Sequence, residues 1–344
     1  MYKPEMIIIR HKRLLFALLF VAVLPGTVSA TTLTRDSVMV EISRYIWHNH
    51  FDSAITDAEA VIASEPANPL GYFVLGTLYQ TVSEEFRTDI YRDTIAALLD
   101  RAIDMADDLK DTDSDTPDWW FIAGAARGYR AIHRAFHGDW WGAFRDGLSL
   151  TKNFKRALKI DSTFYDAYLG IGAYHYYRTI KAKNFLWLPF FSDQREQGIR
   201  EVKIAIEHGT LASFNARESL LRIYFEEGRY DDVCLLADSL APLNPEDTYC
   251  LLYHARSLAA LGKIDDALGK ARKLTRNWKK SKYYDPIGMF EAELVTAEIF
   301  IADGDLASAR KIIDLILAQK KYTDDNNYFD ETYQRAKSLN KELK

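Results

Sequence analysis

Proline and glycine are scarce in this sequence, with nine and seventeen residues among 344. That scarcity excludes a low-complexity linker. The rest of the composition, 48% hydrophobic and 27% charged, is that of an ordinary globular protein. The chain is therefore expected to fold.

The signatures of common catalytic sites are also missing. The sequence contains no nucleophile elbow, no phosphate-binding glycine loop, no zinc-type cysteine pair and no dinucleotide-binding fingerprint. Paired carboxylates occur only where turns or polar helix faces are expected. The sequence thus predicts a non-catalytic protein without a cofactor.

Cysteine is limited to Cys234 and Cys250. They are expected on neighbouring antiparallel helices joined near Asn244-Pro245. Counted outward from that turn, they are offset by about five residues, which is roughly 7 Å along the axis, added to ~8–10 Å between helix axes. That separation exceeds the ~7 Å Cα limit for a disulfide. We expect two free, buried thiols.

Long apolar runs are absent except for Leu14–Leu24, which is eleven residues long. It follows a basic segment, precedes Pro25-Gly26, and is followed by the small-residue sequence Val28-Ser29-Ala30. Because about 20 residues are needed to span a bilayer, this pattern predicts a secretory signal at 1–30, cleaved after Ala30. The mature protein is then periplasmic or secreted, with no integral membrane span.

An uncleaved anchor is the alternative, in which Ile7–Ile9 joins the apolar run. The basic residues within Arg10–Arg13 interrupt that longer segment. No cysteine follows the apolar run, so a lipid-modified N-terminus is not indicated. A cleaved signal remains the favoured interpretation.

The chain has no excess of basic over acidic residues. The full chain carries −5, and removing the four basic residues and one acidic residue of 1–30 leaves −8. Lys279-Lys280 and Lys320-Lys321 are isolated pairs. This charge disfavours nucleic acid or anionic lipid as the main partner.

A short sequence motif, here called the turn motif, recurs along the chain. It is clearest at Gly228–Val233, Gly262–Ala267 and Gly304–Ala309, with fainter copies at Asn49–Ala54 and Gly138–Ala143. Each copy begins with a residue that tolerates a left-handed turn and ends on a small or β-branched residue where helices could cross closely. A recurring motif of this kind indicates stacked helical hairpins. This repeat architecture overrides the estimate of two domains that length alone would give.

A second motif marks the first helix of each hairpin. Copies are Tyr72-x-x-Leu75-Gly76-x-x-Tyr79, Tyr168-x-x-Ile171-Gly172 and Trp120-x-x-Ala123-Gly124. The apolar–small pairs fall on one helical face, where the small member permits close approach of a partner helix.

These motifs resemble the tetratricopeptide repeat, whose pattern is W-x2-L-G-x2-Y, A-x3-F and P over 34 residues. Gly228 to Gly262 spans 34 residues, and Ala54 to Pro66 shows the twelve-residue step to a closing proline. The resemblance covers nearly all of 35–323. It implies an all-α solenoid over 31–325, a right-handed superhelix of about seven helical hairpins, with a C-terminal capping helix in 326–344. The hairpin at Trp119–Ile160 is predicted to be lengthened in both helices.

The pattern breaks at Thr179–Arg195, where the insertion Phe185-Leu-Trp-Leu-Pro-Phe-Phe191 precedes the second helix of a hairpin. The block Gly170–Arg178 with Leu188-Pro189-Phe190 and Asp193-x-Arg195 is similar to a subgroup of exported bacterial repeat proteins. Two interpretations of the aromatic insertion stay open. It packs into the inner surface as a plug, which is favoured because exposed apolar patches of that size are uncommon, or it binds a partner.

The concave groove should be lined by first-helix faces, including Thr77, Gln80 and Glu298. From the groove and the insertion we predict a set of partner-binding residues, since tyrosine and arginine are enriched at binding hot spots. The set comprises Tyr176, Tyr177, Phe185, Trp187, Phe190, Arg222, Phe225 and Arg256. The function predicted is a scaffold that binds a protein or peptide.

Metal sites are not predicted. His133 and His137 are four residues apart on an expected helix, but no H-E-x-x-H motif and no third ligand is evident. His48 and His50 would diverge on a helix. Asp111–Asp115 lacks the glycine and glutamate of a calcium loop, so a solvated acidic turn is expected.

Two other functions remain as alternatives. Trp119-Trp120 and Trp140-Trp141 could stack on sugars in a carbohydrate-binding envelope protein, although packing in the core of a long hairpin is favoured. An enzyme with a site near 179–195 would require a buried cluster of histidine, aspartate and arginine there.

Overall fold

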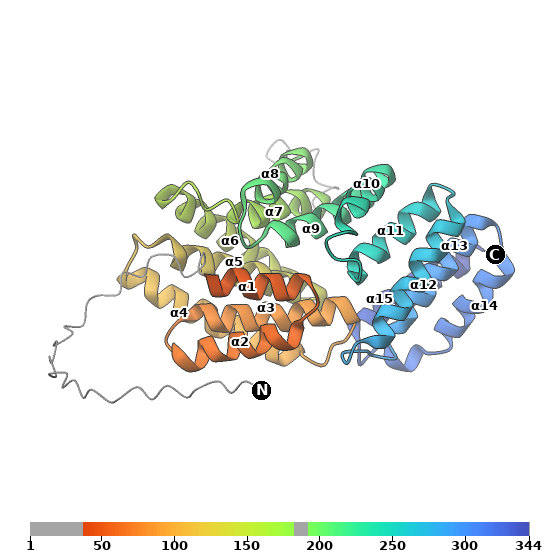
Figure 1. Ribbon diagram of the computed structural model, residues 1–344, viewed down its shortest axis with the longest axis horizontal. Helices are drawn as coiled ribbons and strands as arrows, with labels where there is room; N and C mark the ends of the chain where they lie inside the picture. Colours follow the sequence, from red (N-terminus) through yellow and green to blue (C-terminus); the bar gives the residue numbers. More distant parts are fainter. Residues whose placement is uncertain (1–36, 182–191, 344) are drawn as a thin grey trace, which may run out of the picture. The chain divides into compact units, whose positions relative to one another are not determined.

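The computed structural model describes residues 37–181 and 192–343, which belong to one compact unit (Figure 1). Predictions for the signal at 1–30 and for Phe185, Trp187 and Phe190 lie outside the described residues. The described residues contain helices and no strand, and none of these helices is long and apolar enough to cross a membrane. The α-helices are α1 (Ser37–Trp47), α2 (Phe51–Ser64), α3 (Pro69–Phe86), α4 (Arg92–Thr112), α5 (Pro117–Phe136), α6 (Trp140–Ile160), α7 (Ala167–Lys181), α8 (Arg195–His208), α9 (Ser213–Glu226), α10 (Tyr230–Leu240), α11 (Thr248–Ala260), α12 (Ile264–Lys280), α13 (Met289–Asp303), α14 (Leu306–Leu317) and α15 (Asn327–Glu342), with a 3-10 helix η3 (Lys320–Tyr322) before α15.

Consecutive helices pack as hairpins, from α1 with α2 to α13 with α14, and α15 packs against α13 and α14 (Figure 1). The first helices of neighbouring hairpins also touch, as in α3 with α5, α9 with α11 and α11 with α13. Such contacts build one inner layer of first helices. The prediction of an all-α, tetratricopeptide-like solenoid with a C-terminal capping helix is confirmed.

The recurring turn motif forms the hairpin turns. Its first residue has a positive φ at Asn49 (58°), Gly138 (85°), Gly228 (70°), Gly262 (73°) and Gly304 (83°). Left-handed backbone is accessible mainly to glycine and asparagine, which explains their presence at this position. The structure confirms the predicted turn at all five copies.

Helices α7 and α8 cross closely at two glycines. A Cβ added to Gly172 would lie 2.6 Å from the carbonyl oxygen of Gly198, and one added to Gly198 would lie 2.5 Å from that of Gly172. The neighbouring hairpin has a similar contact, because a Cβ on Gly124 would lie 2.7 Å from the Phe154 ring. Small residues therefore set the distance between paired helices, as the first-helix motif predicted.

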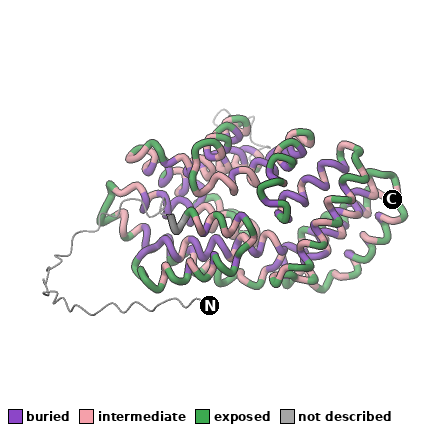
Figure 2. Tube along the Cα trace, viewed as in Figure 1, coloured by how far each residue is buried: buried purple, intermediate pink, exposed green. Residues whose placement is uncertain are grey.

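Buried residues follow the inward faces of the helices (Figure 2). Cys234 and Cys250 are free and buried, which confirms the prediction for both thiols. The lengthened hairpin is also present, since α5 and α6 have 20 and 21 residues against 14 and 11 in α9 and α10.

The prediction of core packing is wrong for Trp140 and Trp141. Trp119 is 6% exposed and buried as expected, but Trp140 is 56% and Trp141 69% exposed. The inward side of α6 is occupied instead by residues such as Gly142 and Asp146, both of which are buried. The two tryptophans consequently lie on the solvent side of the helix.

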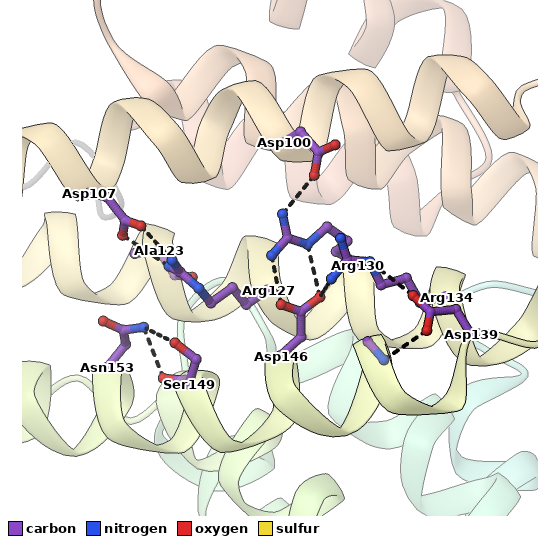
Figure 3. Close-up of polar contacts among 11 residues, drawn as sticks. Asp100, Asp107, Ala123, Arg127, Arg130, Arg134, Asp139, Asp146, Ser149 and Asn153 are labelled. Carbon is purple, nitrogen blue, oxygen red and sulfur yellow. Dashed lines mark hydrogen bonds and ion pairs between the residues drawn. The ribbon is translucent and has the colours of Figure 1, made fainter.

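Ion pairs join α5 to the helices on either side of it (Figure 3). Arg130 makes two hydrogen bonds of 2.8 and 2.6 Å to Asp146 of α6 and a third of 2.6 Å to Asp100 of α4. Arg134 also donates to Asp146, at 2.8 Å. Because Asp146 is buried, both arginines are required to compensate its charge, and they fix the rotation of α6 about its axis.

Gly172→Ala should destabilise the protein by about 1–3 kcal/mol, because the new Cβ forces α7 and α8 apart. The matched control is Gly269→Ala on α12, where nothing lies within 4 Å of the added atom. There the better helix propensity of alanine should stabilise by up to about 1 kcal/mol. Urea unfolding followed by circular dichroism measures both. Equal effects would contradict the close crossing.

Candidate functional site

Contacts between hairpins far apart in sequence enclose part of the inner layer. The side chain of Asn326 donates to the carbonyl of Arg87 at 3.1 Å, and that of Asn327 donates to the carbonyl of Phe136 at 3.2 Å. Thr248 of α11 donates to Glu85 of α3 at 2.8 Å. The start of α15 and the start of α11 are thus held against α3 and α5.

A cavity of about 160 Å³ lies between these helices. Its volume is several times the ~30 Å³ that one water molecule occupies in the liquid. Its walls come from α3, α4, α5, α9, α11, α13 and α15, and from the residues that follow α3 and α5. The lining residues are Gln80, Ser83, Glu84, Arg87, Asp89, Ile95, Ile132, His133, Phe136, His137, Arg222, Tyr249, Tyr253, Arg256, Glu291, Tyr328 and Glu331.

The wall formed by α3 is a polar stripe. Gln80, Ser83, Glu84 and Arg87 follow one another at the spacing of a single helix face. Gln80 Nε2 donates to Glu84 at 2.9 Å. However, Gln80 Oε1, Ser83 Oγ and Arg87 Nε are buried and have no hydrogen-bond partner among the described residues. Buried polar atoms normally have hydrogen-bond partners, so these three atoms are exceptions.

The arginines of the cavity differ in how far they are neutralised. Arg256 is bound by Glu298 at 2.7 Å and by Glu291 at 3.0 Å. Burial alone would lower the pKa of Arg256, but these two carboxylates outweigh it and raise that pKa. Arg222 is paired with Glu226 at 2.9 Å. Arg87 packs over the ring of Tyr328, 5.7 Å from its centroid, and its Nε is still unpaired.

Tyrosines form the opposite part of the wall. Burial raises the pKa of Tyr249 and of Tyr328 well above the usual value, so their hydroxyls stay neutral. Tyr249 and Tyr253 lie with ring centroids 4.9 Å apart. The cavity thus combines neutral hydroxyl donors with guanidinium and carboxylate groups.

Four of the predicted partner-binding residues lie at or beside this cavity. Arg222 and Arg256 line it, and Arg222 lies 5.6 Å from the ring centroid of Tyr177. Phe225 packs edge-on against Tyr253, with centroids 5.3 Å apart. Tyr176 is instead fully buried in the core, where its hydroxyl donates to Glu227 at 3.0 Å. Partner binding by this set stays a prediction.

The sequence reasoning placed Gln80 in the groove but missed Ser83, Arg87, Tyr249, Glu291 and Tyr328. The only sequence signal for these residues is a local one, in α3. The polar stripe of α3 interrupts a helix that is otherwise apolar, which is unusual for a buried element.

His133 of α5 and His137, which follows α5, belong to the cavity wall. Their rings lie 4.3 Å apart, and His137 Nε2 is 3.0 Å from Asp89 Oδ1. Burial lowers the pKa of His133 to about 4. Across the described ranges, no group of three or more histidine, cysteine, aspartate or glutamate side chains is arranged to hold a metal ion. The acidic turn at Asp111–Asp115 is exposed to solvent, as expected.

The ion pairs near the insertion are separate within the described part of the chain. His175 pairs with Glu201 at 2.6 Å, whereas Asp193 pairs with Arg195 at 2.7 Å on the exposed side. The condition set for an enzyme at 179–195, a buried cluster of all three residue types, is therefore not met by the described residues.

Three carboxyls, Asp247 buried and Glu85 and Glu218 half-buried, lie where α3, α9 and α11 meet. Burial, and then the nearby Asp247, raises the pKa of Glu85 to about 8. Burial raises the pKa of Asp247 to about 6 and that of Glu218 well above its usual value. Glu85 accepts hydrogen bonds from Asn49 at 3.0 Å and from Thr248 at 2.8 Å. This junction is therefore most stable when its carboxyls are protonated.

The free energy of unfolding should fall as the pH rises from about 5 to 8. Within that range the folded protein keeps protons that the unfolded carboxyls, with pKa values near 4, have lost. Each such group contributes a slope of up to about 1.4 kcal/mol per pH unit. Glu85→Gln should flatten this dependence, because the amide mimics the protonated acid. Urea titrations across the pH range, with exposed Glu342→Gln as control, measure the difference. Parallel curves for both variants would contradict the assignment.

No family model matches this sequence, and no curated protein matches it. Among solved structures, the P58(IPK) TPR domain is 13% identical over 88% of this chain and 98% of that one, with a TM-score of 0.26. An IFIT1 monomeric mutant, solved with Gppp-AAAA, is 15% identical over 84% of this chain and 67% of that one, with a TM-score of 0.28. TM-scores this low carry no argument about superhelical geometry. The chain's own hairpins, recurring turn motif and small-residue crossings give it a tetratricopeptide-like fold.

Proposed function

We propose that this protein is a non-catalytic scaffold, exported to the periplasm or secreted, that binds a protein or peptide through its inner face. The observation that carries the proposal is the cavity on that face, with three buried polar atoms that lack partners. The predicted signal at 1–30 supports export. A groove formed by stacked hairpins is preorganised, so binding requires little ordering of the receptor.

The unpaired atoms indicate what the partner presents. Gln80 Oε1 can only accept a hydrogen bond, Arg87 Nε can only donate one, and Ser83 Oγ can do both. A peptide unit or a carboxamide side chain carries one N–H donor group and one C=O acceptor. Such a group would satisfy the α3 wall without bringing a net charge into a cavity whose arginines already have carboxylates nearby. An extended peptide segment or loop of a partner meets this requirement.

Carbohydrate binding is the second candidate, because sugar hydroxyls also donate and accept. The exposed Trp140 and Trp141 favour it, since exposed aromatic rings can stack on sugars. Quenching of tryptophan fluorescence across a panel of oligosaccharides tests this candidate separately from peptide binding.

Ser83→Leu should abolish partner binding, because the larger apolar side chain fills the cavity and removes a polar contact. Ser239→Leu makes the same chemical change at an exposed position of α10 and serves as control. A photoreactive phenylalanine analogue at Tyr249 would crosslink the partner in the native envelope, and mass spectrometry would identify both the partner and the segment attached. Thermal melting confirms that each variant is folded. Crosslinks of equal yield in Ser83→Leu and Ser239→Leu would contradict binding in the cavity.

A further inference from the structure

Helix α6 buries polar side chains as well as apolar ones. Its buried side carries Asp146, held by Arg130 and Arg134 (Figure 3). It also carries Asn153, which accepts from Lys110 at 3.0 Å. These contacts to α4 and α5 fix which side of α6 faces inward. The opposite side therefore points to solvent whatever residues it carries.

That opposite side is apolar over its first two turns. Trp141, Phe144 and Leu148 are 69%, 43% and 48% exposed. The three positions fall on one face, because residues three, four and seven apart are neighbours on a helix. The Trp141 and Phe144 rings are stacked with centroids 5.8 Å apart. An apolar face this exposed is unusual for a helix of a water-surrounded repeat array.

The same face becomes basic three turns later. Lys152, Lys155 and Lys159 are exposed, and each lies eleven residues after one of the three apolar residues. Eleven residues correspond to three helical turns, so the lysines continue the line of Trp141, Phe144 and Leu148. Arg145, also exposed, adds a fourth cation beside Phe144. Among the described residues, none of these four cations forms an ion pair, whereas the neighbouring Arg156 lies 3.7 Å from Asp115.

We propose that the exposed face of α6, formed by Trp141, Phe144, Arg145, Leu148, Lys152, Lys155 and Lys159, docks onto an anionic lipid bilayer surface. The aromatic and leucine side chains would enter the interfacial region, where tryptophan is favoured. The four cations would lie among anionic headgroups, which attract basic residues near the membrane surface. The pattern of exposed Trp, Phe and Leu beside lysines is that of interfacial helices.

A protein partner fits this face less well. Lysine is depleted from the cores of protein interfaces, because its desolvation is costly, whereas a lipid surface leaves the ammonium groups hydrated among headgroups. Nucleic acid would make use of the lysines but not of Phe144 and Leu148. The net charge of the whole chain conceals this local basic stripe.

Residues 31–344 should bind vesicles of phosphatidylcholine with phosphatidylglycerol and bind pure phosphatidylcholine vesicles much more weakly. Lys152→Gln with Lys155→Gln should lower the partition constant on anionic vesicles about thirtyfold, roughly fivefold for each charge. The charge-matched control replaces exposed Lys337 and Lys341 of α15 by glutamine. Vesicle sedimentation measures the binding.

A second variant tests the apolar half. Trp141→Ser with Phe144→Ser should reduce binding to anionic vesicles, and circular dichroism should remain unchanged because both side chains are exposed. Quenching of tryptophan fluorescence by brominated lipids should also weaken in this variant. The proposal is overturned if anionic vesicles fail to bind the unsubstituted protein. It is also overturned if the α6 and α15 lysine variants lose binding equally. Lysine-dependent binding to soluble polyglutamate without vesicle binding would assign the face to an acidic protein and would likewise overturn it.

Discussion

The close approach of paired helices at small residues is the constraint on which the rest of this structure depends. A single helical hairpin cannot bury its apolar face alone, so each hairpin is stable only against its neighbours. Gly172 and Gly198 bring the backbones of α7 and α8 into contact, and glycine or asparagine at five hairpin turns lets the chain reverse direction. Once these distances are set, the first helices must form one continuous inner layer.

That inner layer is where the structure departs from a simple apolar core. α3, α11 and the start of α15 meet across it, and their contacts enclose polar side chains that would otherwise be solvated. Burial then changes their chemistry. Arg256 requires two carboxylates, tyrosine hydroxyls remain neutral, and three atoms of the α3 wall are left without partners. Unpaired buried polar atoms are costly to stability, and three of the seven such atoms in the described residues belong to this cavity wall.

Helix α6 also has side chains on an unexpected side, with charged groups inside and apolar groups outside. Its inner side is satisfied by ion pairs with Arg130 and Arg134, which leave Trp141 and its neighbours on the outside. Polar groups are stable inside because their partners are fixed by α5. Apolar groups face outward because no second layer of helices covers them. The inner cavity and the outer face of α6 are thus two separate surfaces, each defined by side chains on the unexpected side of a helix.

The sequence by itself determined the hairpins, their turns and the two free thiols, because these follow from spacing between residues close in the chain. It also indicated Arg222, Arg256 and Tyr177 as inner-face residues from their position in the motif. It could not reveal that Arg87 would meet Tyr328, or that Trp140 and Trp141 would face solvent rather than the core. Those outcomes depend on how far the solenoid winds before distant hairpins touch, and on which side of α6 the arginines of α5 hold. Both are set by the sum of many small rotations between hairpins, which only the tertiary structure fixes.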